Sequence, residues 1–253
     1  MNSTTVRNLL VRGMLAGLAA AVLALAVAYF LGEPDIDRAI GFEEAHASTH
    51  GHETELVSRG LQSTAGLATG VLVYGVAFGG IAALAFCFAL GRVGRFGPRA
   101  TALLLSGSAL LAVYVVPFLK YPANPPAVGN PDTIGERTTL YFLMMLLGVL
   151  LAIAATLLGK RLAPSLGTWW AAVVAVAAFA LAVGIAYAFL PAVDEVPADF
   201  PATVLWRFRL SALAVQTALW AGFGLLFGEL AERLLNPRPE TATATGRPAA
   251  ASN

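Results

Sequence analysis

The chain has 253 residues, of which 58% are hydrophobic and only 12% are charged, and its mean hydropathy is +0.73. Soluble domains are about 45–50% apolar and about 25% charged, so these residues cannot supply the polar surface that a water-soluble domain of this length needs. The formal net charge of +1 gives no reason to expect a nucleic-acid partner, and the single cysteine, Cys87, cannot form an intrachain disulfide.

Six stretches of the chain contain no acidic, basic or histidine residue, and each is long enough for the ~17–25 mainly apolar residues with which a helix crosses a bilayer. We therefore predict an all-α integral membrane protein with six transmembrane helices. Their approximate bounds are 8–31, 64–90, 100–119, 138–159, 169–190 and 209–230. They form one membrane domain over 1–235, and the Pro-, Thr- and Ala-rich segment 236–253 is predicted to be a disordered cytoplasmic tail.

The first stretch allows a second interpretation. Arg7 and Arg12 precede an apolar run with Ala-x-Ala at 26–28, which is the pattern of a cleaved signal peptide. The run is longer than the ~7–15 residues of a signal-peptide apolar region, so a retained membrane helix is favoured.

Charge is distributed unequally between alternate connections. The N-terminus, the segments 91–99 and 160–161 and the C-terminal tail carry ten basic and three acidic residues, whereas the other three loops carry six basic and twelve acidic residues. Basic residues gather on the cytoplasmic side of membrane proteins. Both termini are therefore predicted to be cytoplasmic, with the three acidic loops outside.

Two patterns concern the packing of the spans. Each external loop returns to the membrane through arginine, which would fit three helical hairpins, although we favour arginines that simply extend to lipid phosphates. Glycines four residues apart predict close helix contacts, and the second span, which has two such pairs, is expected at the centre of the bundle. The arginines are Arg59, Arg137, Arg207 and Arg209, and the glycine pairs are Gly13/Gly17, Gly66/Gly70, Gly75/Gly79 and Gly224/Gly228.

Several classes of function are disfavoured by what the spans lack. No acid, base or histidine lies mid-span, which argues against proton-coupled pumps. No phosphate-binding Gly-x-x-x-x-Gly-Lys-Ser/Thr motif is present, which excludes an ATP motor within this chain. No arrangement typical of a catalytic site is recognisable either. We therefore expect neither enzyme activity nor a resident cofactor.

All three histidines lie in the first external loop, among glutamates. Imidazole and carboxylate groups suit divalent first-row metals. The predicted metal ligands are His46, His50, His52, Glu44 and Glu53. An extended segment would present Glu44 and the three histidines on one face, whereas a helix would align only His46 with His50. The alternative is a solvated acidic loop without fixed ligands.

The second external loop is rich in proline, which stiffens it, and Pro117 falls in the last turns of the third span, where it would free a backbone carbonyl. One interpretation is a rigid constriction for an ion at the external mouth, and the other is a plain stiff connection. The path residues predicted by the first interpretation, with Glu136 and Arg137 as a possible pair, are Tyr114, Lys120, Asn124, Asp132, Glu136 and Arg137.

These segments resemble the CbtA family, described as cobalt transporter subunits of bacteria. The resemblance rests on the run 120–126 (Lys-Tyr-Pro-Ala-Asn-Pro-Pro), on 135–138 (Gly-Glu-Arg-Thr), on the histidine-bearing acidic loop and on the return from Val57 to Gly66. It implies cobalt uptake for cobalamin synthesis, a small companion membrane protein of the CbtB type, and a place in the bacterial cytoplasmic membrane.

The function expected from the sequence is therefore that of a membrane subunit of a divalent metal uptake system, with cobalt as the implied ion. Acidic and histidine residues would attract the ion outside, and a narrow path between helices would conduct it. Two alternatives are a non-transporting scaffold subunit and a metal-sensing membrane subunit.

Overall fold

The structure is a computed structural model that describes residues 1–46, 58–126, 128–130 and 132–237. No strand occurs within these ranges, as the sequence predicts. In chain order, the α-helices and the π-helical segments (η) are α1 (Ser3–Val27), η1 (Ala28–Gly32), α2 (Glu33–His46), α3 (Arg59–Leu61), η2 (Gln62–Gly66), α4 (Leu67–Ala89), α5 (Pro98–Ala109), η3 (Leu110–Val115), α6 (Val116–Lys120), α7 (Ile134–Phe189) and α8 (Ala202–Leu235).

Five candidate membrane-spanning helices occur in this part of the chain. They are Ser3–Ala45, Arg59–Ala89, Pro98–Lys120, Ile134–Phe189 and Ala202–Leu235. Each is longer than the span predicted for it, and the first runs on through α2 into the predicted external loop. The greater part of the predicted tail, 238–253, lies outside the described residues, so its disorder stays a prediction.

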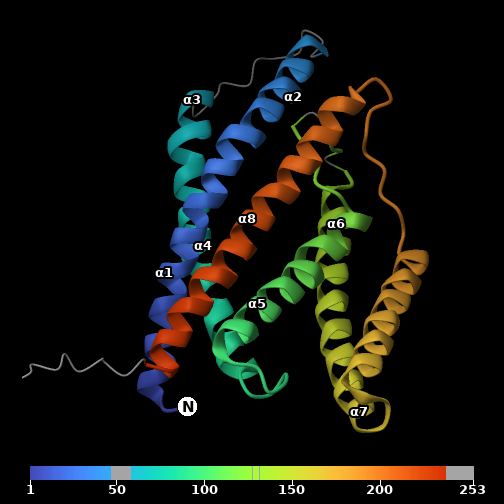
Figure 1. Cartoon of the computed structure of the whole chain (residues 1–253). Helices are drawn as coiled ribbons and strands as arrows, with labels where there is room; N and C mark the ends of the chain where they lie inside the picture. The colour runs from blue at the N-terminus through green and yellow to red at the C-terminus, as the bar shows by residue number, and fades with distance from the viewer. Residues whose placement is uncertain (47–57, 127, 131, 238–253) are drawn as a thin grey trace, which may run out of the picture.

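The helix α7 covers the fourth and fifth predicted spans together. A straight helix of its 56 residues would be about 84 Å long. The backbone leaves the helical conformation at Gly167, where φ is 76° and ψ is 160°. Figure 1 shows α7 as two arms that fold back on each other at this turn. Glycine adopts positive φ at little cost because it has no β-carbon, so this residue permits the reversal.

The closest helix contact joins α1 to α4. A β-carbon placed on Gly17 would lie 2.8 Å from the α-carbon of Gly79, and one placed on Gly13 would lie 2.6 Å from the carbonyl oxygen of Gly79. The two backbones can approach this closely only because both helices carry glycine at the contact. The predicted contact is thus confirmed for the pairs Gly13/Gly17 and Gly75/Gly79.

The other two glycine pairs behave differently from each other. A β-carbon on Gly224 of α8 would lie 2.9 Å from the β-carbon of Ser106 in α5, so this pair also serves packing. In contrast, nothing lies within 4 Å of a β-carbon on Gly70. Of the two pairs in the second predicted span, only Gly75/Gly79 therefore meets another helix. The helix α4 packs mainly on α1, whereas α1 and α8 each pack on two helices, so the prediction that the second span is the centre of the bundle is wrong.

The centre is formed by α1 and α8. The helix α1 packs on both α4 and α8, and α8 in turn packs on α5. Aromatic rings fill the contact between α4 and α8: the ring centroids of Phe78 and Trp220 are 4.6 Å apart, and those of Phe86 and Phe227 are 5.0 Å apart. Four helices therefore share one core, which Figure 1 shows beside the two arms of α7.

The predicted hairpins are only partly present. The first pairing, α1 with α4, is found. In contrast, α8 packs on α1 and α5 rather than on the second arm of α7, so the hairpin predicted for the last two spans is wrong. The arms of α7 join the remaining helices mainly through η3 and α6, where Val116, Met144 and Val183 form a second core cluster.

Candidate functional site

The described part of the predicted site lies at one end of the molecule. At this end α2 finishes, and the segments 121–133 and 190–201 connect the helices (Figure 1). We call it the loop end. The opposite end holds the N-terminus, the connection between α4 and α5 and the turn of α7 (Figure 1).

Two π-helical segments shape the helices near the loop end. Both η1 and η3 finish two residues before a proline, Pro34 and Pro117 respectively. A proline has no N–H, and its ring clashes with the carbonyl four residues earlier, which here belongs to the π-helical segment. The wider π turn lets the helix continue through the proline. Beside Pro117, the carbonyl of Val116 accepts a hydrogen bond from the Tyr187 hydroxyl.

The histidine loop is only partly described. Glu44 and His46 belong to α2, whereas His50, His52 and Glu53 lie outside the described residues. Because Glu44 lies in a helix, the extended arrangement does not hold at this position. No group of three His, Cys, Asp or Glu residues within the described ranges could hold a metal ion. The metal site stays a prediction.

A buried carboxylate fixes the start of α2 against α8. The side chain of Asp35 is only 3% exposed. One of its oxygens, Oδ1, lies 2.6 Å from Arg38 Nη1 and 3.5 Å from Arg207 Nε, and the other accepts a 3.2 Å hydrogen bond from the hydroxyl of Ser211. Because both partners Arg207 and Ser211 belong to α8, this carboxylate holds the two helices together at the loop end.

A second ion-pair group connects α2 to the return of the chain. Arg59 Nη2 lies 3.0 Å from the Asp37 carboxylate and also pairs with Glu33, which is buried. Arg59 is one of the arginines that we expected to extend to lipid phosphates. It binds protein carboxylates instead, and Arg207 does the same with Asp35.

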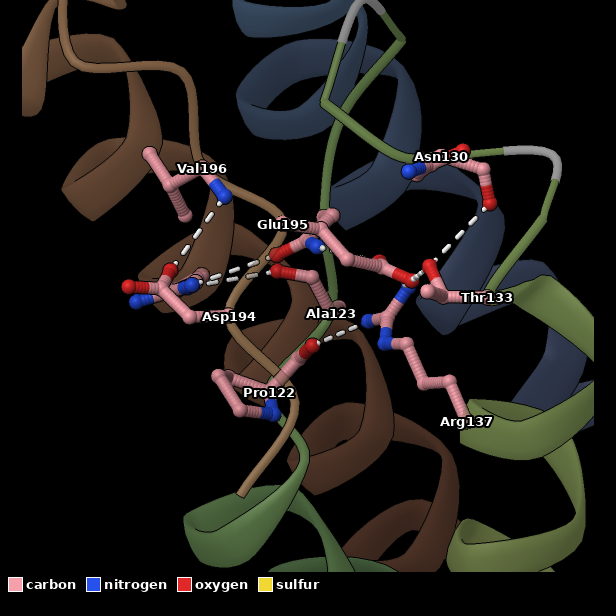
Figure 2. A network of polar contacts seen from close by, with 10 residues as sticks. Pro122, Ala123, Asn130, Thr133, Arg137, Asp194, Glu195 and Val196 are labelled. Atoms are coloured by element: carbon pink, nitrogen blue, oxygen red, sulfur yellow. Dashed lines mark hydrogen bonds and ion pairs between the residues drawn. The ribbon is translucent and has the colours of Figure 1, made fainter.

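The third group centres on Glu195, in the segment before α8 (Figure 2). Its side chain is 3% exposed, and Oε2 lies 3.3 Å from Arg137 Nη1. The other oxygen, Oε1, accepts a 2.6 Å hydrogen bond from the Thr133 hydroxyl. Arg137 also donates to the carbonyl of Pro122. One carboxylate thus ties the segment 190–201 to the start of α7 and, through Arg137, to the proline-rich loop.

Two further cations fix the same loop. Arg209 of α8 donates to the carbonyl of Ala123 over 3.3 Å and to Asn124 Oδ1 over 3.1 Å, while Asn124 donates to Glu195 over 3.4 Å. Lys120 Nζ donates over 2.9 Å to the carbonyl of Tyr187, in the second arm of α7. The proline-rich loop is therefore held by several elements.

The structure separates the six predicted path residues into three sets. Lys120, Asn124 and Arg137 bind neighbouring protein groups, as described above. Asp132 and Glu136 are exposed. Tyr114 lies deeper, in η3, where its ring stacks on Phe118 with the centroids 5.4 Å apart. The suggested pair of Glu136 and Arg137 is wrong, because Arg137 pairs with Glu195.

A cavity of about 250 Å³ lies beside this group, between η3, α6 and the first turns of α7. Tyr114 and Arg137 are the only predicted path residues among those that line it. The lining residues are Tyr114, Phe118, Tyr121, Ala123, Ile134, Arg137, Thr138 and Tyr141. The cavity is therefore aromatic, with hydroxyl groups and one guanidinium.

The chain matches, over residues 6–232, the family described as "Probable cobalt transporter subunit (CbtA)". The match covers nearly the whole chain. The chain belongs to the CbtA family. As a member of this family with several apolar helices, it is a multi-pass membrane protein, and the family is described as one of transporter subunits rather than of enzymes. The description implies a metal ion as substrate and a partner subunit. No curated protein and no solved structure matches the chain.

Two residues that organise the loop end, Asp35 and Glu195, were not among the predicted site residues. In the sequence they are two of twelve acidic residues in the acidic loops, with nothing that marks them for burial. One signal in the sequence could have indicated buried carboxylates: the arginine at each return to the membrane. The charge of such an arginine can be balanced by a carboxylate from another loop as well as by a lipid phosphate.

Proposed function

We propose that this CbtA-family chain is the membrane subunit of a divalent metal uptake system, with cobalt as the ion. The supporting observation is an imbalance of charge at the loop end. All six of its basic residues bind carboxylates or carbonyl and amide oxygens of the protein. Four exposed acidic residues, Glu43, Glu44, Asp132 and Glu136, have no cationic partner within the described part of the chain. Their charge remains available to attract a cation.

In the proposed topology the loop end is external and both termini are cytoplasmic. The two arms of α7 then cross the bilayer separately, which gives six crossings in the bacterial cytoplasmic membrane. The distribution of basic residues supports this orientation, because Arg92, Arg95 and Arg99 lie in or next to the connection between α4 and α5, at the opposite end.

The first external loop is proposed to capture the ion. His46, His50 and His52 supply imidazole nitrogens, Glu44 and Glu53 supply carboxylates, and Asp132 and Glu136 extend the negative surface. Capture by a loop requires its ordering, so binding should be loose. Release towards the membrane would be correspondingly easy. The ion is the substrate of the protein rather than a resident cofactor.

The partner is proposed to be a small membrane protein of the CbtB type. Two other roles are compatible with membership of a family of transporter subunits: a scaffold that binds a partner through its loops, and a metal-sensing subunit. Both predict that the chain carries no ion by itself. Cobalt flux into liposomes that contain the purified chain, with and without the partner, separates these roles from a conducting subunit.

Replacing the three histidines by alanine tests the capture loop. In cells, H46A/H50A/H52A is expected to reduce cobalt uptake several-fold at limiting cobalt but to leave it nearly unchanged at saturating cobalt, because the loop raises the local ion concentration. Protons compete with metal for imidazole, so acidification should lower wild-type uptake more than uptake by the variant. Radioactive cobalt uptake at several pH values measures both effects.

The matched control is S48A/T49A, which changes the same loop without removing an imidazole. It should retain wild-type uptake at all cobalt concentrations. Equal uptake by the histidine variant and the control at limiting cobalt would contradict the capture role.

Cysteine labelling tests the topology. In a C87A background, H50C is expected to react with a membrane-impermeant maleimide added to intact cells, and R95C is expected to react only after the membrane is opened. The two positions lie on opposite sides of the bilayer in the proposed topology. Labelling of R95C but not H50C in intact cells would reverse the orientation and remove the basis for ion capture outside.

A further inference from the structure

The cavity beside Arg137 contains hydrogen-bond donors that the protein leaves unused. The hydroxyls of Tyr114, Thr138 and Tyr141 all belong to lining residues, and none has a hydrogen-bond partner in the described ranges. In contrast, the hydroxyl of Tyr121 donates to the carbonyl of Pro191 over 2.9 Å. Three unpaired hydroxyls around one cavity of about 250 Å³ indicate a site for a polar ligand.

Two guanidinium groups lie on the loop side of the cavity. The guanidinium of Arg137 uses its two terminal nitrogens for Glu195 and Pro122, which leaves its Nε without a partner in this part of the chain. Arg209 adds a second cation next to Ala123, another lining residue. Arg137 pairs with the buried carboxylate of Glu195, and the carboxylate of Asp194 lies near Arg209. The unpaired Nε of Arg137 is therefore the cationic donor that remains for a negatively charged group of a ligand.

One carboxylate lies at the rim of the same site. Glu136 is exposed and precedes Arg137 in the first turn of α7. Burial, together with the nearby Glu136 carboxylate, raises the pKa of Tyr121 above its ordinary value. This places the negative charge of Glu136 close to the aromatic lining, whose ring faces also attract cations. A ligand that carries a positive group next to a negative group would match both the Glu136 carboxylate and the Arg137 guanidinium.

The site is at the boundary between membrane and water. Its charged residues lie where α6 ends and α7 begins, and its deeper wall is formed by Tyr114 and Tyr141 within the candidate spans. Next to it Ile134 is 63% exposed, which provides an apolar surface at the rim. Aromatic rings at this depth are usual partners of lipid headgroups.

We propose that this cavity binds the headgroup of a zwitterionic phospholipid, with the phosphodiester at Arg137 Nε and the three hydroxyls, and the ammonium at Glu136 and the aromatic rings. For Tyr114 and Arg137 this role replaces the ion-path role predicted from the sequence. A bound lipid would fill the space between η3, α6 and α7, where the arms of α7 join the remaining helices.

Native mass spectrometry of the purified full chain tests the proposal. Phosphatidylethanolamine should bind more tightly than phosphatidylglycerol with the same acyl chains, and the variant Y114F/T138V/Y141F should lose this preference. Removing three hydrogen bonds should weaken binding of phosphatidylethanolamine by about tenfold or more. Arg137 is kept in the variant because it also holds the loop.

The control variant Y29F/Y74F removes two exposed tyrosine hydroxyls that do not line the cavity. It should bind phosphatidylethanolamine like the wild type. Soluble glycerophosphoethanolamine, added in competition, distinguishes recognition of the headgroup from recognition of the acyl chains, and it should compete at high concentration. Equal binding of the two lipids by the wild type, or an equal effect of the cavity and control variants, would overturn the proposal. Neither result depends on cobalt transport.

Discussion

Gly79→Ala is expected to destabilise the protein by about 3 kcal/mol, the upper end of the usual cost of overpacking a core. The added β-carbon would lie 2.9 Å from the α-carbon of Gly17 and would also collide with the carbonyl of Gly13. These neighbours are backbone atoms of α1, so no side-chain rotation can relieve the collision. The helices α1 and α4 would have to separate, and α1 would also lose part of its fit against α8.

The same substitution at Gly70 is the matched control, because it lies in the same helix. Nothing lies within 4 Å of a β-carbon at Gly70. Alanine is favoured over glycine in a helix by about 0.5–1 kcal/mol, so Gly70→Ala should be neutral or slightly stabilising. Thermal unfolding of the two variants in the same detergent measures the contrast. Equal stabilities would show that the contact of α1 with α4 is not as close as described.

The spans could be predicted because membrane crossing depends on local composition. A run of about 20 residues without charge is recognisable without knowledge of its neighbours. The longer helices of the structure could not be predicted in this way, since α2 continues α1 through Glu33 and Asp35, which look like loop residues in the sequence. Both are buried and paired with arginines of other segments, so the polar sequence there is compatible with a packed helix.

The arrangement of the spans was less predictable than their existence. The spacing of Gly66/Gly70 is identical to that of Gly75/Gly79, yet only the second pair meets another helix. Which face of α4 turns towards α1 depends on the whole bundle. The hairpin suggested for the last two spans failed for the same reason: it was inferred from the arginines at the return of each external loop, whereas α8 packs on α1 and α5.

The polar contacts of the loop end show a similar limit. Glu136 is next to Arg137 in the sequence, which suggested a pair. In the first turn of α7, however, adjacent residues point about 100° apart, and Arg137 turns towards the loops while Glu136 faces outwards. Its partner, Glu195, comes from a segment 58 positions later and is brought there by the folding back of α7.

Glu195→Ala is expected to destabilise the protein by about 3 kcal/mol, the lower end of the cost of breaking a buried ion pair. The lower end applies because the Arg137 side chain is 24% exposed and can be partly hydrated, whereas that of Glu195 is 3% exposed. The variant also removes the acceptor of Thr133 and Asn124. The segments 121–133 and 190–201 should loosen together. Thermal unfolding in detergent measures the loss.

Glu136→Ala is the matched control, since Glu136 is an exposed carboxylate next to the same arginine and should change stability by no more than about 0.5 kcal/mol. A double-mutant cycle of Glu195→Ala with Arg137→Ala should show a coupling of about 1–3 kcal/mol, because either single change removes the same interaction. Additive losses, or an equal loss in Glu136→Ala, would contradict the role of Glu195. If the coupling is found, the loop end is held together by a buried carboxylate, and the exposed acidic residues are not needed for its stability, as the proposed attraction of an ion requires.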